Sequence, residues 1–370
     1  MKKKVLVLSA KTGGGHRAAA LAVLEAFNHI EHDLEITHYD FIENAPRPFD
    51  DLPKYYSTIT KLPPAYGSIF KATEGKRQAK FSTDTIARLY KTHLEKVINQ
   101  FDPDIILSFH FGANCIMPVL QGMGKTTPYI TVVTDLATGH PMWFDERTSA
   151  CIVPSHEAYV RARTYGMPAS KLHIIGLPIN RQFGLEKRSK TEIRKSLGWP
   201  IDTPAILVMT GGDGLGKINT LSRRIDNAKL IDASVAINAG RNATLEKNLS
   251  KRNWKKPTIV YGFRDDIADM MHAADVLLTK AGPGTIVEAI VSRLPIVIYD
   301  FLPGQEEGNL EYVVSNHAGV WASTAALATR ATQDILNGNV TVGGAAYEKT
   351  RLRHEHAAEK IAEFVKNYPI

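Results

Sequence analysis

The sequence has few cysteines, no long apolar run and no recognisable leader, and each shortage excludes a class of protein. Only two cysteines, Cys115 and Cys151, occur in 370 residues. Each lies beside an apolar run, so we expect buried, reduced thiols and no disulfide framework. Apolar stretches such as Val5–Leu8 and Ala205–Met209 are far shorter than the roughly 20 residues of a membrane-spanning helix. The run after the N-terminal lysines is too short for a signal-peptide core. These shortages favour a protein of the cytosol.

Acidic residues are also in short supply relative to basic ones. The chain has 38 Asp and Glu against 45 Lys and Arg, which gives a net charge of +7. Such a charge favours an anionic partner: nucleic acid, an anionic membrane face or a phosphorylated small molecule. The hydrophobic share of 44% is ordinary for a globular protein and excludes a disordered chain. The length predicts two domains.

Much of the excess positive charge lies in one stretch, residues 54–91, which we name the basic–aromatic segment. It contains eight basic, two acidic and six aromatic side chains. Such a composition suits a membrane surface, because aromatic rings can enter the headgroup layer while lysines bind anionic lipid. Each lysine contributes about 1 kcal/mol of binding free energy. A solvated surface helix is the alternative, and nucleic-acid binding is disfavoured because no binding motif accompanies the charge. The membrane-binding residues expected here are Lys54, Tyr55, Tyr56, Lys61, Tyr66, Phe70, Lys71, Lys76, Arg77 and Lys80.

Two successive series of apolar strands, each opening on a glycine-rich turn, predict two doubly wound Rossmann-like α/β domains facing a cleft. The expected strands are 3–9, 34–41, 105–109, 129–133, 150–153 and 172–175, then 205–210, 234–238, 258–261, 276–279 and 295–299. We place the domains at 1–178 and 179–350, with a polar linker at 178–191. A helix within 351–370 can pack back on the first domain.

The first glycine-rich turn, Gly13–Gly15, follows an apolar strand and opens a helix at His16. With Ala18 and Asp40 it also fits a nicotinamide-dinucleotide fingerprint. That signal is weak, because any backbone that approaches an anion at a helix N-terminus needs such glycines. His16 stands where open α/β sheets bind ligands. With an ordinary pKa of about 6.5, it can accept a proton from a hydroxyl group, or it can simply cap the helix.

Three loops of the second domain are expected to end at one sheet edge. The turn 210–216 and the turn Gly282–Thr285 can present backbone N–H groups to phosphate. Glu288, one helical turn further on, suits a ribose diol, and the polar loop 303–309 suits the hydroxyls of a sugar. The combination predicts a nucleotide-sugar site. We expect no metal at Asp102–Asp104, because this acidic pair introduces a strand and so lies opposite the ligand edge.

Together these motifs resemble the family of monogalactosyldiacylglycerol synthases and processive diacylglycerol glucosyltransferases, relatives of the peptidoglycan transferase MurG. The resemblance covers nearly the whole chain and is carried by residues 12–19, 133–144, 262–264, 280–288 and 304–309. It implies a glycosyltransferase B architecture, with a lipid acceptor on the N-terminal domain and a UDP-hexose on the C-terminal domain. It also implies inversion to a β-glycoside without a bound metal.

The resemblance assigns roles to particular residues. It implies that the acceptor is faced by His16, Asp135, His140 and Trp143, with Gly14 and Gly15. We expect His16 to be the catalytic base, with Asp135 either orienting it or acting in its place. Phe263 and Arg264 would flank the uracil, while Gln305, Glu306 and Asn309 would contact the sugar. Without a metal, helix N-termini and Lys280 would meet the charge of the leaving diphosphate, at about 0.3–1 kcal/mol for each helix. The donor-binding residues are thus Gly211, Gly212, Asp213, Phe263, Arg264, Lys280, Gly282, Gly284, Thr285, Glu288, Gln305, Glu306 and Asn309.

The expected function is therefore transfer of hexose from UDP-galactose or UDP-glucose to diacylglycerol. The enzyme would be a peripheral protein on the cytoplasmic side of a membrane that contains anionic lipids, with no cofactor and no nucleic-acid partner. Four alternatives remain open: a UDP-sugar epimerase, a transferase to another acceptor, a nicotinamide-dependent oxidoreductase and a non-catalytic lipid-binding protein.

Overall fold

The computed structural model describes residues 2–10, 14–47, 49–51, 58–60, 62–209 and 217–370, with the backbone alone for Phe49 and Pro63. The chain divides into two compact units. Unit 1 comprises Met1–Asn180, Pro303–Gln305 and His356–Ile370, and unit 2 comprises Arg181–Leu302 and Glu306–Glu355. The first boundary therefore follows residue 180, where the sequence suggested 178. The C-terminal tail predicted at 351–370 is divided between the units.

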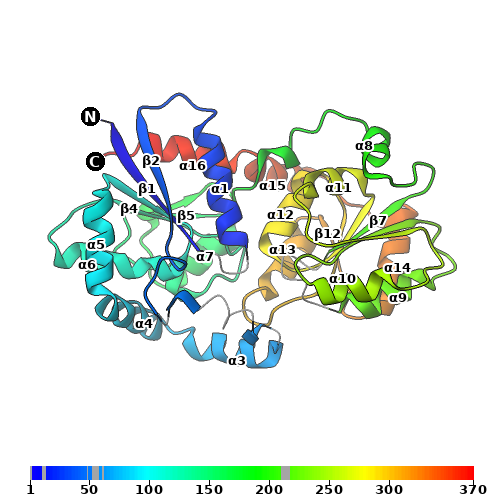
Figure 1. The fold of residues 1–370 in the computed structure, drawn as a ribbon, viewed down its shortest axis with the longest axis horizontal. Coiled ribbons are helices and arrows are strands. Elements are labelled where there is room, and N and C mark those ends of the chain that lie inside the picture. Colours follow the sequence, from blue (N-terminus) through cyan, green and yellow to red (C-terminus); the bar gives the residue numbers. More distant parts are fainter. Residues whose placement is uncertain (1, 11–13, 48, 52–57, 61, 210–216) are drawn as a thin grey trace. The chain divides into compact units, whose positions relative to one another are not determined.

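Unit 1 is a parallel sheet of six strands in the order β2-β1-β3-β4-β5-β6, with helices on both faces (Figure 1). Alternate residues of β1 point to opposite faces: Val5 and Val7 join one apolar cluster, while Leu6 and Leu8 join another. Its strands are β1 (Lys3–Ser9), β2 (Leu34–Asp40), β3 (Ile105–Ser108), β4 (Tyr129–Val132), β5 (Ala150–Val153) and β6 (Leu172–Ile174). Its helices are α1 (Gly15–Phe27), α3 (Pro63–Thr73), α4 (Lys76–Leu89), α5 (Lys91–Phe101), α6 (Ile116–Gly122), α7 (His156–Thr164) and α16 (Ala357–Lys366).

The C-terminal helix α16 is part of the unit 1 core. Its residues Ala358, Ile361, Ala362 and Val365 are buried in the same cluster as residues of α1, β1, β3, β4 and β5. Figure 1 shows α16, in red, beside α1, although about 180 residues of sequence separate it from β6. The fold therefore closes unit 1 with its last helix.

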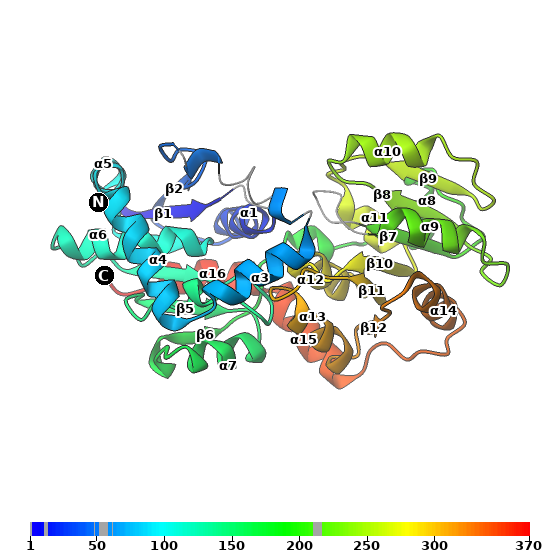
Figure 2. The ribbon, with the colours of Figure 1, turned by 90° about the horizontal axis from the view of Figure 1, so that it is seen from below.

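Unit 2 is a second parallel sheet of six strands, in the order β12-β11-β10-β7-β8-β9 (Figure 2). Its strands are β7 (Ala205–Met209), β8 (Ser234–Asn238), β9 (Thr258–Tyr261), β10 (Val276–Lys280), β11 (Ile296–Asp300) and β12 (Gly319–Trp321). Its helices are α8 (Lys190–Leu197), α9 (Ile218–Asp226), α10 (Ala243–Ser250), α11 (Ile267–Ala273), α12 (Pro283–Val291), α13 (Glu307–Ser315), α14 (Ala325–Leu336) and α15 (Ala345–Glu355). One face of the sheet buries an apolar cluster under α9, α10 and α14.

The predicted strands are all present, with ends that differ by one residue at most, and the structure adds the short edge strand β12. The proposed linker 178–191 is partly wrong, because α8 begins inside it at Lys190. Ser189 caps α8 by accepting a hydrogen bond from the N–H of Glu192, whose side chain bonds back to Ser189. This capping box is a sequence signal for a helix start that the polar composition concealed.

Each sheet has a point where the strand order reverses, and ligands of open α/β sheets bind outside such points. In unit 1 the reversal lies between β1 and β3, and in unit 2 between β7 and β10. Because β10 and β11 are parallel neighbours, the residues that directly follow them, from Ala281 and from Phe301, lie at one edge of the sheet. The third predicted loop, 210–216 after β7, lies outside the described residues. His16 follows β1 and the Gly282 turn follows β10.

Candidate functional site

His16 occupies the first turn of α1, at the reversal point of the unit 1 sheet. Its N-cap, Gly14, has φ +81°, a conformation that favours glycine, while Gly15 is helical and a Cβ on it would meet nothing within 4 Å. Among the described residues no side chain caps α1, so His16 does not act as a helix cap. Instead its Nδ1 lies 2.6 Å from Oγ1 of Thr134, which follows β4.

Aromatic rings surround the imidazole of His16. His110 packs edge-on at 4.8 Å between ring centroids, and Trp143 lies at 5.7 Å. His110 stacks on Phe111, and its pKa is held well below the usual value by burial and by the neighbouring His16. Sequence reasoning missed His110, although it follows β3 directly at the ligand edge, which is the signal that could have identified it.

Asp135 lies beside this cluster with its carboxylate buried. Trp143 donates a hydrogen bond from Nε1 to Oδ2 of Asp135 at 2.7 Å, and Gln305 donates from Nε2 to Oδ1 at 2.9 Å. Tyr66 in turn donates to the side-chain oxygen of Gln305. The short loop 303–305 thus belongs to unit 1, where the amide of Gln305 contacts Asp135.

Two opposing effects act on the pKa of His16. Burial lowers it, while the negative charge of Asp135 and a hydrogen bond to the backbone of Phe109 raise it. Burial is the larger effect, so the pKa lies below the usual value and the ring is neutral at pH 7. A neutral imidazole next to a buried carboxylate is equipped to accept a proton and to be stabilised once it carries the charge.

His140, predicted to face an acceptor, is instead packed inside unit 1. Its Nδ1 accepts a hydrogen bond from the N–H of Met142, and its Nε2 lies 3.1 Å from Oγ1 of Thr73. Burial lowers its pKa to about 4, which keeps the ring neutral. The phenyl ring of Phe70 lies against it at 5.0 Å. His140 therefore anchors α3 to the segment that carries Trp143.

The prediction that Phe70 contacts lipid is wrong, because its ring is only 6% exposed and packs on His140. Tyr66, from the same helix, directs its hydroxyl to Gln305. Lys71, Lys76, Arg77 and Lys80 are exposed on α3 and α4. The remaining expected membrane residues, Lys54, Tyr55, Tyr56 and Lys61, lie outside the described residues.

In unit 2 the N-terminus of α12 faces the reversal point of the sheet. Gly282 is the N-cap and Pro283 fills the first position, where no N–H is needed. The N–H groups of Gly284 and Thr285 follow in the first turn, where a helix offers its unpaired donors and positive dipole end to an anion. Burial raises the pKa of Glu288, one turn further on, to about 7.

Lys280 is not the free cation that the sequence suggested. Its Nζ pairs with Oε1 of Glu306 at 2.5 Å, and Oε2 of Glu306 accepts a hydrogen bond from the N–H of Leu302. Asn309 is also buried, and its side-chain amide donates to the carbonyl of Ala281 at 2.8 Å. Glu306 and Asn309 therefore hold Lys280 and Ala281, the two residues that directly precede the Gly282 turn. Gly211, Gly212 and Asp213 lie outside the described residues.

Phe263 and Arg264 follow β9, at the same edge as the Gly282 turn. Phe263 is half exposed, whereas Arg264 forms a two-point ion pair with Asp266. The charge of Arg264 is therefore already balanced by a neighbouring carboxylate. The family pattern led us to expect Arg264 beside a nucleotide base. In the structure its guanidinium is instead paired with Asp266, two residues further along the chain.

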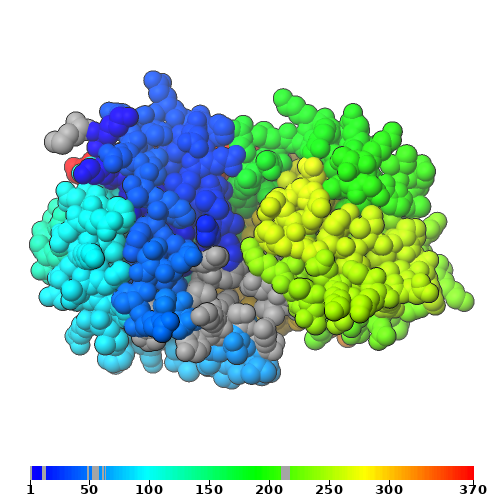
Figure 3. Space-filling view, viewed as in Figure 1, coloured from blue at the N-terminus to red at the C-terminus, as the bar shows by residue number. Residues whose placement is uncertain are grey.

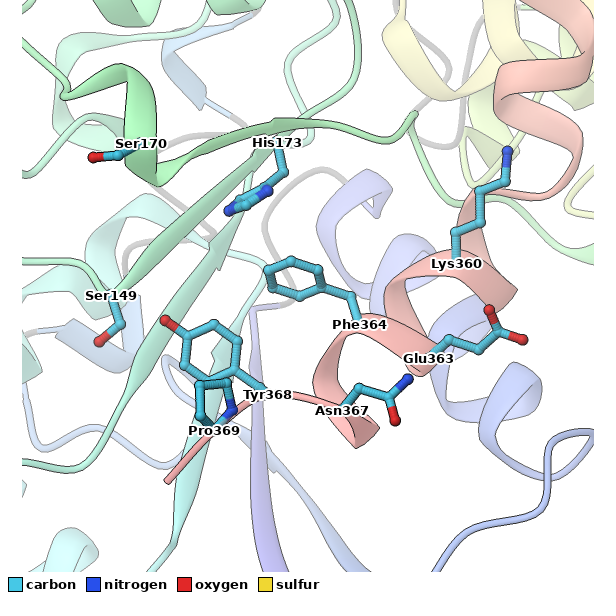
Figure 4. A pocket seen from close by; sticks show the side chains of 9 residues that line it. All are labelled: Ser149, Ser170, His173, Lys360, Glu363, Phe364, Asn367, Tyr368 and Pro369. Atoms are coloured by element: carbon cyan, nitrogen blue, oxygen red, sulfur yellow. The ribbon is translucent and has the colours of Figure 1, made fainter.

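Two features lie away from this chemistry. A pocket of about 580 Å³ in unit 1, between β6 and α16, is lined by His173, Phe364 and Tyr368 among others (Figure 4). Ser149, which directly precedes β5, and Ser170, two residues before β6, also line it. The pocket therefore lies at the amino ends of these strands, opposite the edge where ligands are expected. Within the described ranges, no group of three or more metal-ligating side chains is placed to hold an ion. The same ranges contain no helix long and apolar enough to cross a membrane.

The two sheets define the class of fold. The solved structure of MurG from Acinetobacter baumannii superimposes with a TM-score of 0.62 at 13% identity, over 99% of this chain and 100% of that one. This chain therefore has the glycosyltransferase B architecture.

Sequence comparisons define the family within that class. A family model for monogalactosyldiacylglycerol (MGDG) synthase matches residues 16–179, and one for the glycosyltransferase family 28 C-terminal domain matches residues 205–362. Monogalactosyldiacylglycerol synthase 3 of Arabidopsis thaliana is 35% identical over 91% of this chain and 75% of its own length. The synthase of Spinacia oleracea is 37% identical over 86% of this chain. The chain belongs to the monogalactosyldiacylglycerol synthase family, and spans 63% of the length of the spinach relative.

Proposed function

We propose that the protein transfers a hexose from a UDP-sugar to the free hydroxyl of diacylglycerol, with inversion to a β-glycoside. The names of its relatives suggest galactolipid synthesis. The observation that carries the proposal is that Trp143 contacts both His16 and the buried carboxylate of Asp135 at the reversal point of unit 1. Unit 2 of the same chain offers a helix N-terminus at Gly282 that is suited to an anion. A proton acceptor and a diphosphate site are the two requirements of this reaction.

In the proposed mechanism His16 is the general base. Both carboxylate oxygens of Asp135 already accept hydrogen bonds, so Asp135 is less suited to remove a proton itself. As the hydroxyl of the acceptor attacks the anomeric carbon, its proton passes to the imidazole and the bond to the diphosphate breaks. Asp135 stabilises the imidazolium, and the N–H groups of Gly284 and Thr285 stabilise the departing UDP. We propose that no metal ion takes part.

A donor screen tests the function. The purified protein is incubated with vesicles that contain diacylglycerol and with labelled UDP-galactose or UDP-glucose, in the presence of a chelator. We expect a hexosyl-diacylglycerol product from one of these donors, undiminished by the chelator. No transfer from either donor contradicts the proposal, and release of an epimerised free or nucleotide-linked sugar without acceptor supports an epimerase instead.

Glu288 gives donor binding a predicted pH dependence. With a pKa of about 7, the carboxyl is half protonated at pH 7, and its ionised form is the better acceptor for the two hydroxyls of a ribose. Binding of UDP-hexose should therefore lower this pKa and release roughly half a proton at pH 7, with affinity rising as pH increases through 7. Calorimetry in buffers of different ionisation enthalpy measures the release, with UDP-hexose as ligand because its diester phosphates do not titrate there.

The matched variant for this prediction is Glu288→Gln, which retains the shape of the side chain but cannot titrate. It should bind UDP-hexose more weakly and with no proton release. Proton release that is unchanged in this variant would show that another group is responsible.

We also propose that α4 docks on an anionic membrane surface. Phe81 is 71% exposed, and the basic residues Arg77, Lys80 and Arg88 of this amphipathic helix are exposed as well. Positions 77, 81 and 88 fall on one helical stripe, and position 80 lies beside it, so these side chains share the outward face. Figure 3 shows that the adjacent helix α3, in light blue, is also at the surface. Such docking would make the protein peripheral to the membrane, and we propose the cytoplasmic side as its location.

Vesicle sedimentation tests this docking. Phe81→Ser should weaken binding to vesicles that contain phosphatidylglycerol by several-fold, and Arg77→Glu with Lys80→Glu should abolish the preference for anionic over neutral vesicles. Leu230→Ser is the matched control, since Leu230 is as exposed (79%) but lies in unit 2. Equal losses in Phe81→Ser and the control would contradict a specific role for α4.

A further inference from the structure

The carboxylate of Asp135 is buried without a cation beside it. Its side chain is 3% exposed, and in the described part of the chain no lysine or arginine forms an ion pair with it. Burial of a charge is costly unless its oxygens accept hydrogen bonds. Each oxygen accepts one: Trp143 donates to Oδ2 at 2.7 Å, and Gln305 donates to Oδ1 at 2.9 Å. Gln305 therefore supplies one of the two N–H groups that hold this carboxylate.

The side-chain amide of Gln305 is itself oriented by a neighbour. An ionised carboxylate can only accept hydrogen bonds, so the amide must turn its NH₂ group toward Asp135 and its carbonyl oxygen away. The hydroxyl of Tyr66, on α3, donates to that carbonyl oxygen. The three side chains form a series in which each donor points toward Asp135, and hydrogen bonds in such a series strengthen one another. The orientation of the amide thus depends on Tyr66.

The backbone that carries Gln305 is fixed by close contacts within unit 1. The hydroxyl of Thr138 donates to the backbone carbonyl of Gln305 at 2.6 Å. Gly304 has φ +86°, which favours glycine, and a Cβ added to it would lie 2.7 Å from the ring of Phe70. A Cβ on Gly67 of α3 would come within 2.9 Å of the same loop. The loop therefore packs tightly on α3, and this packing delivers the amide to the carboxylate.

These contacts differ from the role that the family resemblance implied, in which Gln305 contacts the sugar of the donor. The amide nitrogen is used by Asp135 and the amide oxygen by Tyr66. A sugar hydroxyl that drew the nitrogen away would leave a buried carboxylate oxygen without its donor, which costs free energy. The hydrogen bonds therefore favour a role of Gln305 toward Asp135.

We propose that Gln305, oriented by Tyr66, is a positioning residue that fixes the carboxylate of Asp135 and does not select the donor sugar. This inference rests on the proposed hexose transfer. In that reaction the imidazole of His16 gains positive charge only as the acceptor hydroxyl loses its proton. A carboxylate that is already in place stabilises this charge without reorganisation, and so lowers the barrier more than it strengthens substrate binding.

Kinetics at saturating diacylglycerol vesicles, combined with calorimetry of UDP, UDP-galactose and UDP-glucose, tests the positioning role. Gln305→Ala should lower kcat about 10- to 100-fold, while the donor KM and all nucleotide affinities stay within about twofold of wild type. Tyr66→Phe keeps the ring and removes only the hydroxyl, so it should lower kcat about 3- to 10-fold. In the Gln305→Ala background, Tyr66→Phe should have no further effect, because Tyr66 acts through Gln305.

Two substitutions elsewhere in unit 1 serve as matched controls. Tyr159→Phe on α7 and Gln121→Ala on α6 make the same chemical changes away from Asp135, and both should retain the kcat of wild type. Scanning calorimetry checks that each variant is folded. If Gln305→Ala fails to fold, the more conservative Tyr66→Phe still provides the kcat and KM comparison.

The outcomes separate this inference from the proposed function. A raised donor KM in Gln305→Ala with kcat unchanged, together with weaker binding of a UDP-hexose but not of UDP, would assign Gln305 to the sugar and overturn the positioning role. Additive losses in the double variant would show that Tyr66 does not act through Gln305. If wild type transfers hexose and both single variants keep its kcat, the positioning role is wrong and the proposed function stands. Absence of transfer by wild type contradicts the proposed function itself.

Discussion

Replacement of His16 by alanine should lower kcat about 10²- to 10⁴-fold, the range over which a positioned general base contributes. UDP affinity should change little, because His16 belongs to unit 1 and the nucleotide contacts proposed here belong to unit 2. The ring is half buried, its Nδ1 is held by Thr134, and its pKa is lowered by burial, so it is neutral and oriented at pH 7. Measurement of kcat at saturating donor, alongside UDP calorimetry, checks both expectations.

The pH profile distinguishes catalysis from a structural effect. In wild type, kcat should fall as pH decreases through the lowered pKa of His16, since the protonated ring cannot act as a base. In Asp135→Asn the fall should move to lower pH, because the negative charge that favours the imidazolium is gone. His29→Ala, at an exposed histidine just beyond α1, is the control. Near-normal kcat in His16→Ala with a large loss in Asp135→Asn would identify Asp135 as the base.

Removal of residues 356–370 should prevent unit 1 from folding. Four of the five apolar residues that α16 buries belong to the cluster on one face of the sheet, which also contains Ala19 and Val23 of α1. Loss of the helix exposes that face, and the free energy involved exceeds what a marginally stable domain can lose. We expect an insoluble product, or a chain with only the thermal transition of unit 2.

A point substitution makes the same prediction measurable in a folded protein. Ile361 is fully buried, and Ile361→Ala should destabilise unit 1 by about 2–5 kcal/mol through lost burial and a cavity. Glu363→Ala, on the exposed side of the same helix, should change stability by less than about 0.5 kcal/mol. Differential scanning calorimetry should show one transition shifted and the other unmoved. Equal shifts in both variants would mean that α16 is not part of the core.

Much of the fold and part of the site could be predicted from local patterns. Apolar strands followed by glycine turns are contiguous in sequence, so β1, β7 and β10 were predicted correctly. Side-chain contacts between residues that are distant in sequence could not be predicted from local patterns. Lys280 meets Glu306 across 26 residues, and Thr73 meets His140 across 67. We expected Lys280 and His140 to contact ligands, and these two contacts show that they support neighbouring segments of the chain instead.

Length, charge and local sequence patterns therefore determined the class of protein: a two-domain α/β chain with glycine-opened helices, a basic–aromatic segment and a histidine at a helix start. Only the tertiary structure decided which polar groups are available. Arg264 and Arg241 carry the same guanidinium, yet one is neutralised by Asp266 and the other lies over Phe263 without an acidic partner among the described residues. The physical reason is that a charge acts through its distance to other charges and through its burial, and both are set by packing between segments that the sequence holds far apart.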